Sequence, residues 1–200
     1  MEILTPPDNI EMVYVEGSDT VKGFYMGKYE VTQKQYQDVM GTNPSYFKGN
    51  NRPVELVSWD DAQEFIKRLN ARTGRSYRLP TEVEWEYAAR EGTKKSSYEY
   101  SGCNNIDEVA WFSRYDNGLS GNSGDQTHPV GQKKPNALGI YDMSGNVWEW
   151  CHDHYSNSGS DRVLRGGGWR DLAVYCRVAH RGNLYPDNRG SNLGFRLVLP

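Results

Sequence analysis

The sequence is poor in cysteine, in long apolar runs and in excess positive charge. Its 200 residues include three cysteines. This number is too small for a disulfide framework, and because it is odd, at least one thiol stays unpaired within the chain. No run approaches the roughly 18 apolar residues that a membrane-spanning helix needs. The net charge of −3 argues against nucleic acid as the main partner.

The first ten residues, MEILTPPDNI, lack the basic and apolar regions of a signal peptide. Glycine and aromatic residues are abundant, with 21 Gly, 14 Tyr and 6 Trp. This composition favours one loop-rich domain over residues 1–200, with a core of large rings that carry polar groups. The oligomeric state is not readable from it.

Three segments begin with the same helix-capping pattern, a Ser or Thr followed three residues later by an acid or amide. The pairs are Thr32 with Gln35, Ser58 with Asp61, and Thr81 with Glu84. Apolar residues at helical spacing follow each pair, so we expect about three helices. The alternating segment 11–31 predicts a hairpin of strands, and regular periodicity fades over residues 93–139.

A series of ordered motifs over residues 11–199 resembles the formylglycine-generating-enzyme (sulfatase-modifying-factor) domain family. The motifs are MVYVEG, GKYEVTQKQY, PVELVSWDDAQEF, YRLPTEVEWEYAAR, HPVGQKKPNALGIYDMSGNVWEW, RVLRGGGW and NLGFRL. The resemblance implies an α+β fold of the C-type-lectin type that is irregular and loop-rich, with few short strands.

The enzymes of this family work through paired cysteines that bind copper, and thiolate sulfur suits Cu(I). The corresponding stretch here, residues 168–177, is shorter and holds only Cys176. We therefore expect a non-enzymatic protein that requires no cofactor. A copper oxidoreductase of the formylglycine-generating type and a static structural member of the superfamily are the alternatives.

The segment 163–199 resembles the variable region of proteins that are diversified by retroelements. In such regions, mutation of template adenines cannot produce Lys, Glu, Gln, Met or Trp. These five types make up 39 of the 200 residues, yet none occurs among residues 170–192. A window of that length would hold about five at the average composition. We therefore expect an exposed, diversified surface on a fixed framework.

In this interpretation Arg165, Arg177, Arg181 and Arg189 belong to the framework and bond carbonyls or carboxylates. Phe195 and Leu197 fill the core. The expected ligand is a macromolecular surface, a protein rather than nucleic acid, because Tyr and Asn are typical of antibody-like contact loops. The predicted ligand-binding residues are Trp169, Arg170, Asp171, Leu172, Tyr175, Val178, His180, Gly182, Asn183, Leu184, Tyr185, Gly190, Ser191 and Asn192.

The family resemblance also implies a structural calcium ion. Its ligands would be the side chains of Asp142 and Glu149 and the carbonyls of Gly145 and Val147, because oxygen ligands suit Ca²⁺. The resemblance to variable proteins further implies a lipid anchor at the cell surface. A cytoplasmic location is the alternative, since this sequence shows no lipobox.

Overall fold

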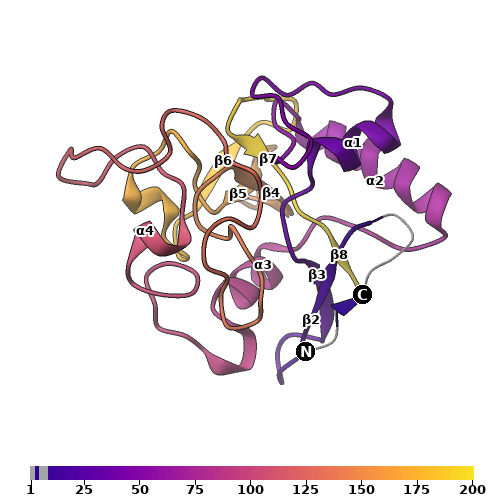
Figure 1. The fold of residues 1–200 in the computed structure, drawn as a ribbon. Helices are drawn as coiled ribbons and strands as arrows, with labels where there is room; N and C mark the ends of the chain where they lie inside the picture. Colours follow the sequence, from indigo (N-terminus) through magenta and orange to yellow (C-terminus); the bar gives the residue numbers. More distant parts are fainter. Residues whose placement is uncertain (1–2, 5–8) are drawn as a thin grey trace.

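The computed structural model describes residues 3–4 and 9–200, so most of the segment considered for a signal peptide lies outside the described residues. Two four-stranded sheets form in this part of the chain (Figure 1). The first has the strand order β1-β2-β3-β8. Its strands are β1 (Ile3–Leu4), β2 (Met12–Val15), β3 (Phe24–Gly27) and β8 (Val198–Leu199).

The β2–β3 pair is antiparallel, with Val13 opposite Met26, which confirms the predicted hairpin. Strand β8 adds to β3, so the last residues of the chain complete a sheet that the first strands begin. Strands β2, β3 and β8 therefore lie together on one side of the molecule (Figure 1).

The second sheet has the order β6-β5-β4-β7. Its strands are β4 (Trp148–His154), β5 (Arg162–Arg165), β6 (Gly182–Leu184) and β7 (Leu193–Gly194). Three of these strands belong to the predicted variable region 163–199 or overlap it. That region is therefore part of a sheet and is not a separate C-terminal tail.

The described part of the chain holds four α-helices and two short 3₁₀ helices. They are α1 (Gln33–Met40), α2 (Trp59–Thr73), α3 (Glu82–Ala89), α4 (Ile106–Val109), η1 (Gly92–Lys94) and η2 (Ala173–Cys176). All three predicted capping pairs form complete capping boxes. Helix α4 is additional to the expected three, and the side chain of Asn105 caps it.

The core is rich in aromatic rings, as the composition predicts. Phe195 packs edge-to-face on Phe65, with ring centroids 5.4 Å apart, and Phe65 stacks on Tyr36. Leu197 is also buried. Trp150 is fully buried, and its indole N–H donates to the Val57 carbonyl. The observed fold is the loop-rich α+β architecture that the sequence predicts.

Candidate ligand-binding surface

A glycine turn brings the predicted variable region close to the body. Gly166 and Gly167 have φ angles of 97° and 73°, a region that side chains other than glycine rarely adopt. A Cβ atom on Gly167 would lie 2.8 Å from the Cys176 sulfur and 2.8 Å from the Tyr175 carbonyl oxygen. Only glycine at this position lets η2 pack directly on the turn.

Framework arginines tie the 170–192 loop to two helices. Arg181 donates to both carboxylate oxygens of Glu82 on α3, at 2.6 and 2.7 Å. Arg189 donates to both oxygens of Asp61 on α2, at 2.8 and 3.0 Å. Such two-point contacts fix orientation as well as distance. The prediction that these arginines bond carboxylates is confirmed.

The other two framework arginines, Arg165 and Arg177, also restrict the conformation of this loop. Arg165 is fully buried, pairs with Glu86, and donates to the carbonyls of Val178 and His180 at 2.9 and 3.0 Å. Arg177 pairs with Glu99 at 2.6 Å. A buried guanidinium that spans two backbone carbonyls restricts the loop between them.

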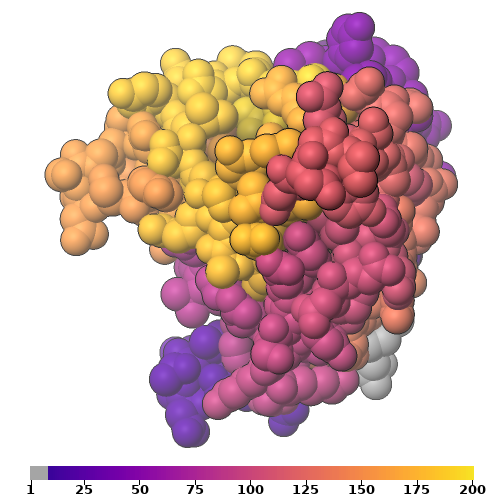
Figure 2. All heavy atoms as spheres, turned by 90° about the vertical axis from the view of Figure 1, so that its left-hand side faces the viewer, coloured from indigo at the N-terminus to yellow at the C-terminus, as the bar shows by residue number. Residues whose placement is uncertain are grey.

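Between these anchors, several predicted side chains reach solvent. Leu172, Tyr175 and Tyr185 are 36%, 38% and 59% exposed, and Arg170 is exposed as well. The half-buried members of the predicted set are Trp169, Asp171, His180, Gly182, Asn183, Leu184, Gly190 and Ser191. Figure 2 shows the C-terminal residues, in orange and yellow, gathered over one part of this face.

The expectation that Val178 and Asn192 are solvent-exposed is wrong, because they are 1% and 3% exposed. The Val178 amide bonds the Glu99 carbonyl, and its side chain joins the core cluster that contains Trp85. Asn192 accepts the Trp148 amide through its backbone, immediately before β7. Both positions lie where the loop is fastened to the body, so their side chains point inward.

A depression of about 420 Å³ lies within this surface. We call it the central depression. Seven of the predicted residues line it, namely Arg170, Asp171, Gly182, Asn183, Leu184, Gly190 and Asn192. The remaining lining residues are Trp148, Leu164, Asn188, Arg189 and Leu193. The structure therefore brings half of the predicted set around one concave site.

Three aromatic residues, Trp148, Phe47 and Tyr46, belong to the surface or lie next to it, although the predicted ligand-binding residues do not include them. Trp148 is 8% exposed and lines the depression. Phe47 packs edge-to-face on Trp169, with centroids 5.2 Å apart, and its neighbour Tyr46 is 70% exposed. Tyr46 and Phe47 lie more than 120 positions before Trp169, so no local pattern links them to the loop.

Two ionisable side chains of this surface, Asp171 and His180, are partly buried. The Asp171 carboxylate accepts the Trp148 indole N–H at 2.8 Å, and burial raises the pKa of Asp171 above its ordinary value. Burial also lowers the pKa of His180. The His180 ring lies 4.9 Å from the Tyr175 ring and 5.9 Å from that of Trp148. The His180 ring therefore makes an aromatic contact with each of these two rings.

The residues expected to bind calcium fit that role only in part. Asp142 is buried, accepts the Gly131 amide through Oδ2, and leaves Oδ1 without a hydrogen-bond partner in the described part of the chain. Glu149 instead accepts two hydrogen bonds from Arg196, at 2.6 Å each, and one from the Trp85 indole. The guanidinium already neutralises this carboxylate. Calcium at Asp142, Gly145, Val147 and Glu149 stays a prediction from the resemblance.

The cysteines are not arranged as a reactive pair on the surface. All three are free, and Cys151 and Cys176 are buried. Burial raises the pKa of the Cys176 thiol, which disfavours the thiolate that binds copper. Over residues 3–4 and 9–200, no group of three His, Cys, Asp or Glu side chains is placed to hold a metal ion.

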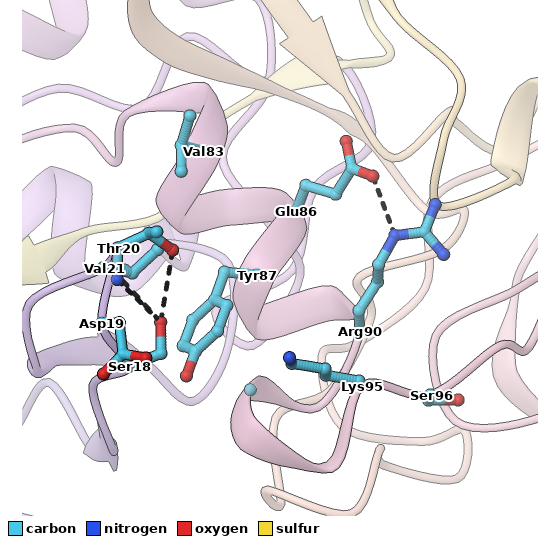
Figure 3. A pocket seen from close by; sticks show the side chains of 11 residues that line it. Ser18, Asp19, Thr20, Val21, Val83, Glu86, Tyr87, Arg90, Lys95 and Ser96 are labelled. Carbon is cyan, nitrogen blue, oxygen red and sulfur yellow. Dashed lines mark hydrogen bonds and ion pairs between the residues drawn. The ribbon is translucent and has the colours of Figure 1, made fainter.

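A second hollow, of about 570 Å³, lies between the β2–β3 turn and α3 (Figure 3). Glu86 and Arg90 form an ion pair on one side of it, and Tyr87 and Ser18 lie on the other. None of the predicted ligand-binding residues lines this hollow. It supplies a reference surface that lies outside the predicted variable region.

Comparisons with known proteins agree with this architecture. The model of the sulfatase-modifying factor enzyme 1-like domain matches residues 15–200. The chain is 40% identical to the chaperone protein LppX of Paenibacillus barcinonensis, over 92% of this chain and 83% of that protein. It is 36% identical to the formylglycine-generating enzyme of Streptomyces coelicolor, over 73% of this chain, but spans only 52% of the enzyme.

Among solved structures, variable protein 1 of Treponema denticola superposes with a TM-score of 0.86 at 31% identity. The match covers 99% of this chain and 98% of the other. In the part of the chain that the structure describes, no helix is long and apolar enough to cross a membrane.

Proposed function

The chain belongs to the sulfatase-modifying factor enzyme 1-like domain family, and from that premise we propose that it is a non-enzymatic ligand-binding protein. Its 163–199 segment displays a diversified surface that binds a protein ligand. One observation carries the proposal. Seven residues of the predicted set line the central depression, and exposed members such as Tyr175 and Tyr185 lie on the same 170–192 loop, which Arg181 and Arg189 fasten to α3 and α2.

A diversified surface requires that the residues that fix the fold are different from the residues that vary. Substitutions at exposed positions usually change stability by less than about 0.5 kcal/mol, whereas core substitutions cost several times more. The loop conformation here depends on paired arginines, glycines and buried residues such as Val178. Exposed side chains such as Tyr185 are free to change because none of those contacts includes them.

The cysteine environment supports a binding role over copper chemistry. Cys176 is buried beneath the glycine turn, where Gly167 packs against its sulfur. A copper site of the family type needs a second thiolate in the same stretch, and that stretch has none. We further propose that the protein acts at the cell surface through a lipid anchor, as the resemblance to variable proteins implies.

Diversification is tested by the DNA next to the gene. We expect an adenine-rich repeat, beside a reverse-transcriptase gene, that matches the codons for residues 163–199. Differences between the two copies should fall at adenines and at codons for exposed residues such as Tyr175 and Tyr185. A neighbourhood with neither a repeat nor a reverse transcriptase would remove the diversified part of the proposal.

Ligand binding is tested by displaying two libraries of the protein against one purified target, such as lysozyme. The first library varies Arg170, Leu172, Tyr175, Asn183 and Tyr185. The second varies residues around the hollow of Figure 3, namely Ser18, Asp19, Thr20, Val83 and Lys95. We expect specific binders from the first library only. Equal recovery from both libraries would contradict the proposed surface.

The similarity to LppX supports a second candidate, a chaperone that shields folding proteins. The two candidates differ in specificity. A chaperone should slow the aggregation of several unrelated unfolded proteins, and a dedicated binding protein should slow none of them. Light scattering of unfolded citrate synthase and rhodanese, with and without this protein, separates the two.

A further inference from the structure

One buried hydrogen-bond acceptor among the residues that line the central depression lacks a donor. Asn192 is 3% exposed, and its Oδ1 has no hydrogen-bond partner among the residues that the structure describes. An unpaired buried acceptor destabilises the folded protein, because it loses its hydrogen bonds to water without gaining a donor. The atom lies beside Gly190, where a Cβ would come within 3.0 Å of it, and both residues line the depression.

Asp171 places a negative charge next to this atom. Its Oδ2 accepts the Trp148 indole N–H, and it lies 3.5 Å from the Asn192 side-chain nitrogen. Among the residues that line the depression, Asp171 is the sole acid. Because it is half-buried, its charge is less screened than a charge at the surface.

The two cations of the lining do not satisfy these acceptors. Arg189 directs its guanidinium to Asp61 on α2, outside the depression. Arg170 is exposed; its charge acts to lower the pKa of Asp171, but water and salt screen it. The lining of the depression therefore includes a carboxylate, a buried amide oxygen without a donor and an indole ring.

We propose that the central depression binds one basic side chain of the protein ligand, a lysine or an arginine. The ammonium or guanidinium group donates to Asp171 and to Oδ1 of Asn192, and the alkyl stem lies against Trp148 and Leu184. This inference rests on the proposed function, because it names the chemistry by which the displayed surface holds its ligand. A single anchored side chain in a desolvated pocket is a common source of binding energy at protein interfaces.

The test is a titration of the ¹⁵N-labelled protein followed through the Trp148 indole N–H resonance, which reports directly on Asp171. The probes are the Nα-acetyl methylamides of lysine, arginine, norleucine and glutamate. We expect the lysine or the arginine probe to shift this resonance in a saturable manner. Norleucine, which has the stem of lysine without its charge, and glutamate should leave it unchanged.

Asp171→Asn keeps the shape of the side chain and removes its charge, so saturation should need about five times more of the basic probe, or more. Asp187→Asn is the matched control, because it removes one nearby charge outside the depression, and it should behave as the parent. An equal response to glutamate or norleucine, an equal response in both variants, or no response to either basic probe would overturn the inference. The library experiment varies neither Asp171 nor Asn192, so it can succeed when this test fails.

Discussion

Neighbouring residues on the 170–192 loop have opposite roles. Leu172 is 36% exposed and Val178 is 1% exposed, although six positions separate them. The sequence predicts both as surface residues, because the side chains of a loop do not alternate regularly between the core and the solvent. The inward direction comes from the Val178 amide, which bonds Glu99 in a distant segment.

Val178→Ala is expected to lower the free energy of unfolding by about 1–3 kcal/mol, because it opens a small cavity beside Trp85. Leu172→Ala removes more atoms and should change it by less than about 0.5 kcal/mol. Urea unfolding of the two variants measures the difference. Equal losses would place Leu172 in the core and contradict the division described here.

Glu55 is a buried acid that accepts a hydrogen bond from the backbone of Phe47, whose ring packs on Trp169. Its Oε1 accepts the Phe47 amide at 2.8 Å, and its Oε2 has no hydrogen-bond partner within the described ranges. Burial raises the pKa of Glu55 to about 7. The folded protein therefore keeps this proton up to about pH 7, while the unfolded chain loses it near its ordinary value of 4.5.

The raised pKa predicts a loss of stability with rising pH. Because the unfolded chain binds fewer protons than the folded protein above pH 4.5, the stability contribution of Glu55 is lost as the pH rises through about 7. Glu55→Gln stays neutral, so its stability relative to the parent should improve by about 2 kcal/mol between pH 5 and pH 8. Urea unfolding at both values checks this. Glu64→Gln, at an exposed site, should show the same difference from the parent at each pH.

At the scale of elements, the loop depends on α2 and α3 for its shape. The amides of Leu56 and Trp59, just before and at the start of α2, donate to the carbonyls of Gly190 and Pro186. The Arg189–Asp61 ion pair lies beside these two bonds. The loop is thus fastened to the beginning of α2 by backbone and side chain together.

Arg189→Gln should loosen this attachment without unfolding the protein. The ion pair is exposed, so its loss should lower the free energy of unfolding by no more than about 1 kcal/mol. The amide hydrogens of Leu56 and Trp59 should nevertheless exchange faster with solvent. Arg68→Gln removes another ion pair of α2, with Glu64, and should not affect these amides. Unchanged exchange in Arg189→Gln would show that the backbone alone fixes the loop.

The elements that sequence patterns predict are those with local signals. The capping boxes at Thr32, Ser58 and Thr81 depend on residues three positions apart, and all three form. Helix α4 has only four residues, too few to show a period. The ion pairs that attach the loop to α2 and α3 could not be predicted either, because Asp61 and Glu82 lie about 100 positions or more before their arginine partners.

At the scale of the whole molecule, the candidate surface combines segments from three parts of the chain. The 41–52 loop contributes Tyr46, β4 contributes Trp148, and the predicted variable region contributes the remainder. The sequence predicted only the last of these, through its composition and its resemblance to variable proteins. The same C-terminal segment also completes both sheets through β6, β7 and β8, so exposed residues and residues that hold the fold together alternate within one stretch of the chain.

The central claim is that the exposed side chains of this surface can be exchanged without disturbing the body beneath them. Its most direct test is one variant in which the exposed residues Arg170, Leu172, Tyr175 and Tyr185 are all replaced by Ser, compared with the parent by urea unfolding. We predict a cooperative transition with the same slope and a free energy of unfolding within about 2 kcal/mol of the parent. A loss of about 5 kcal/mol, or a protein that no longer folds, would contradict the account.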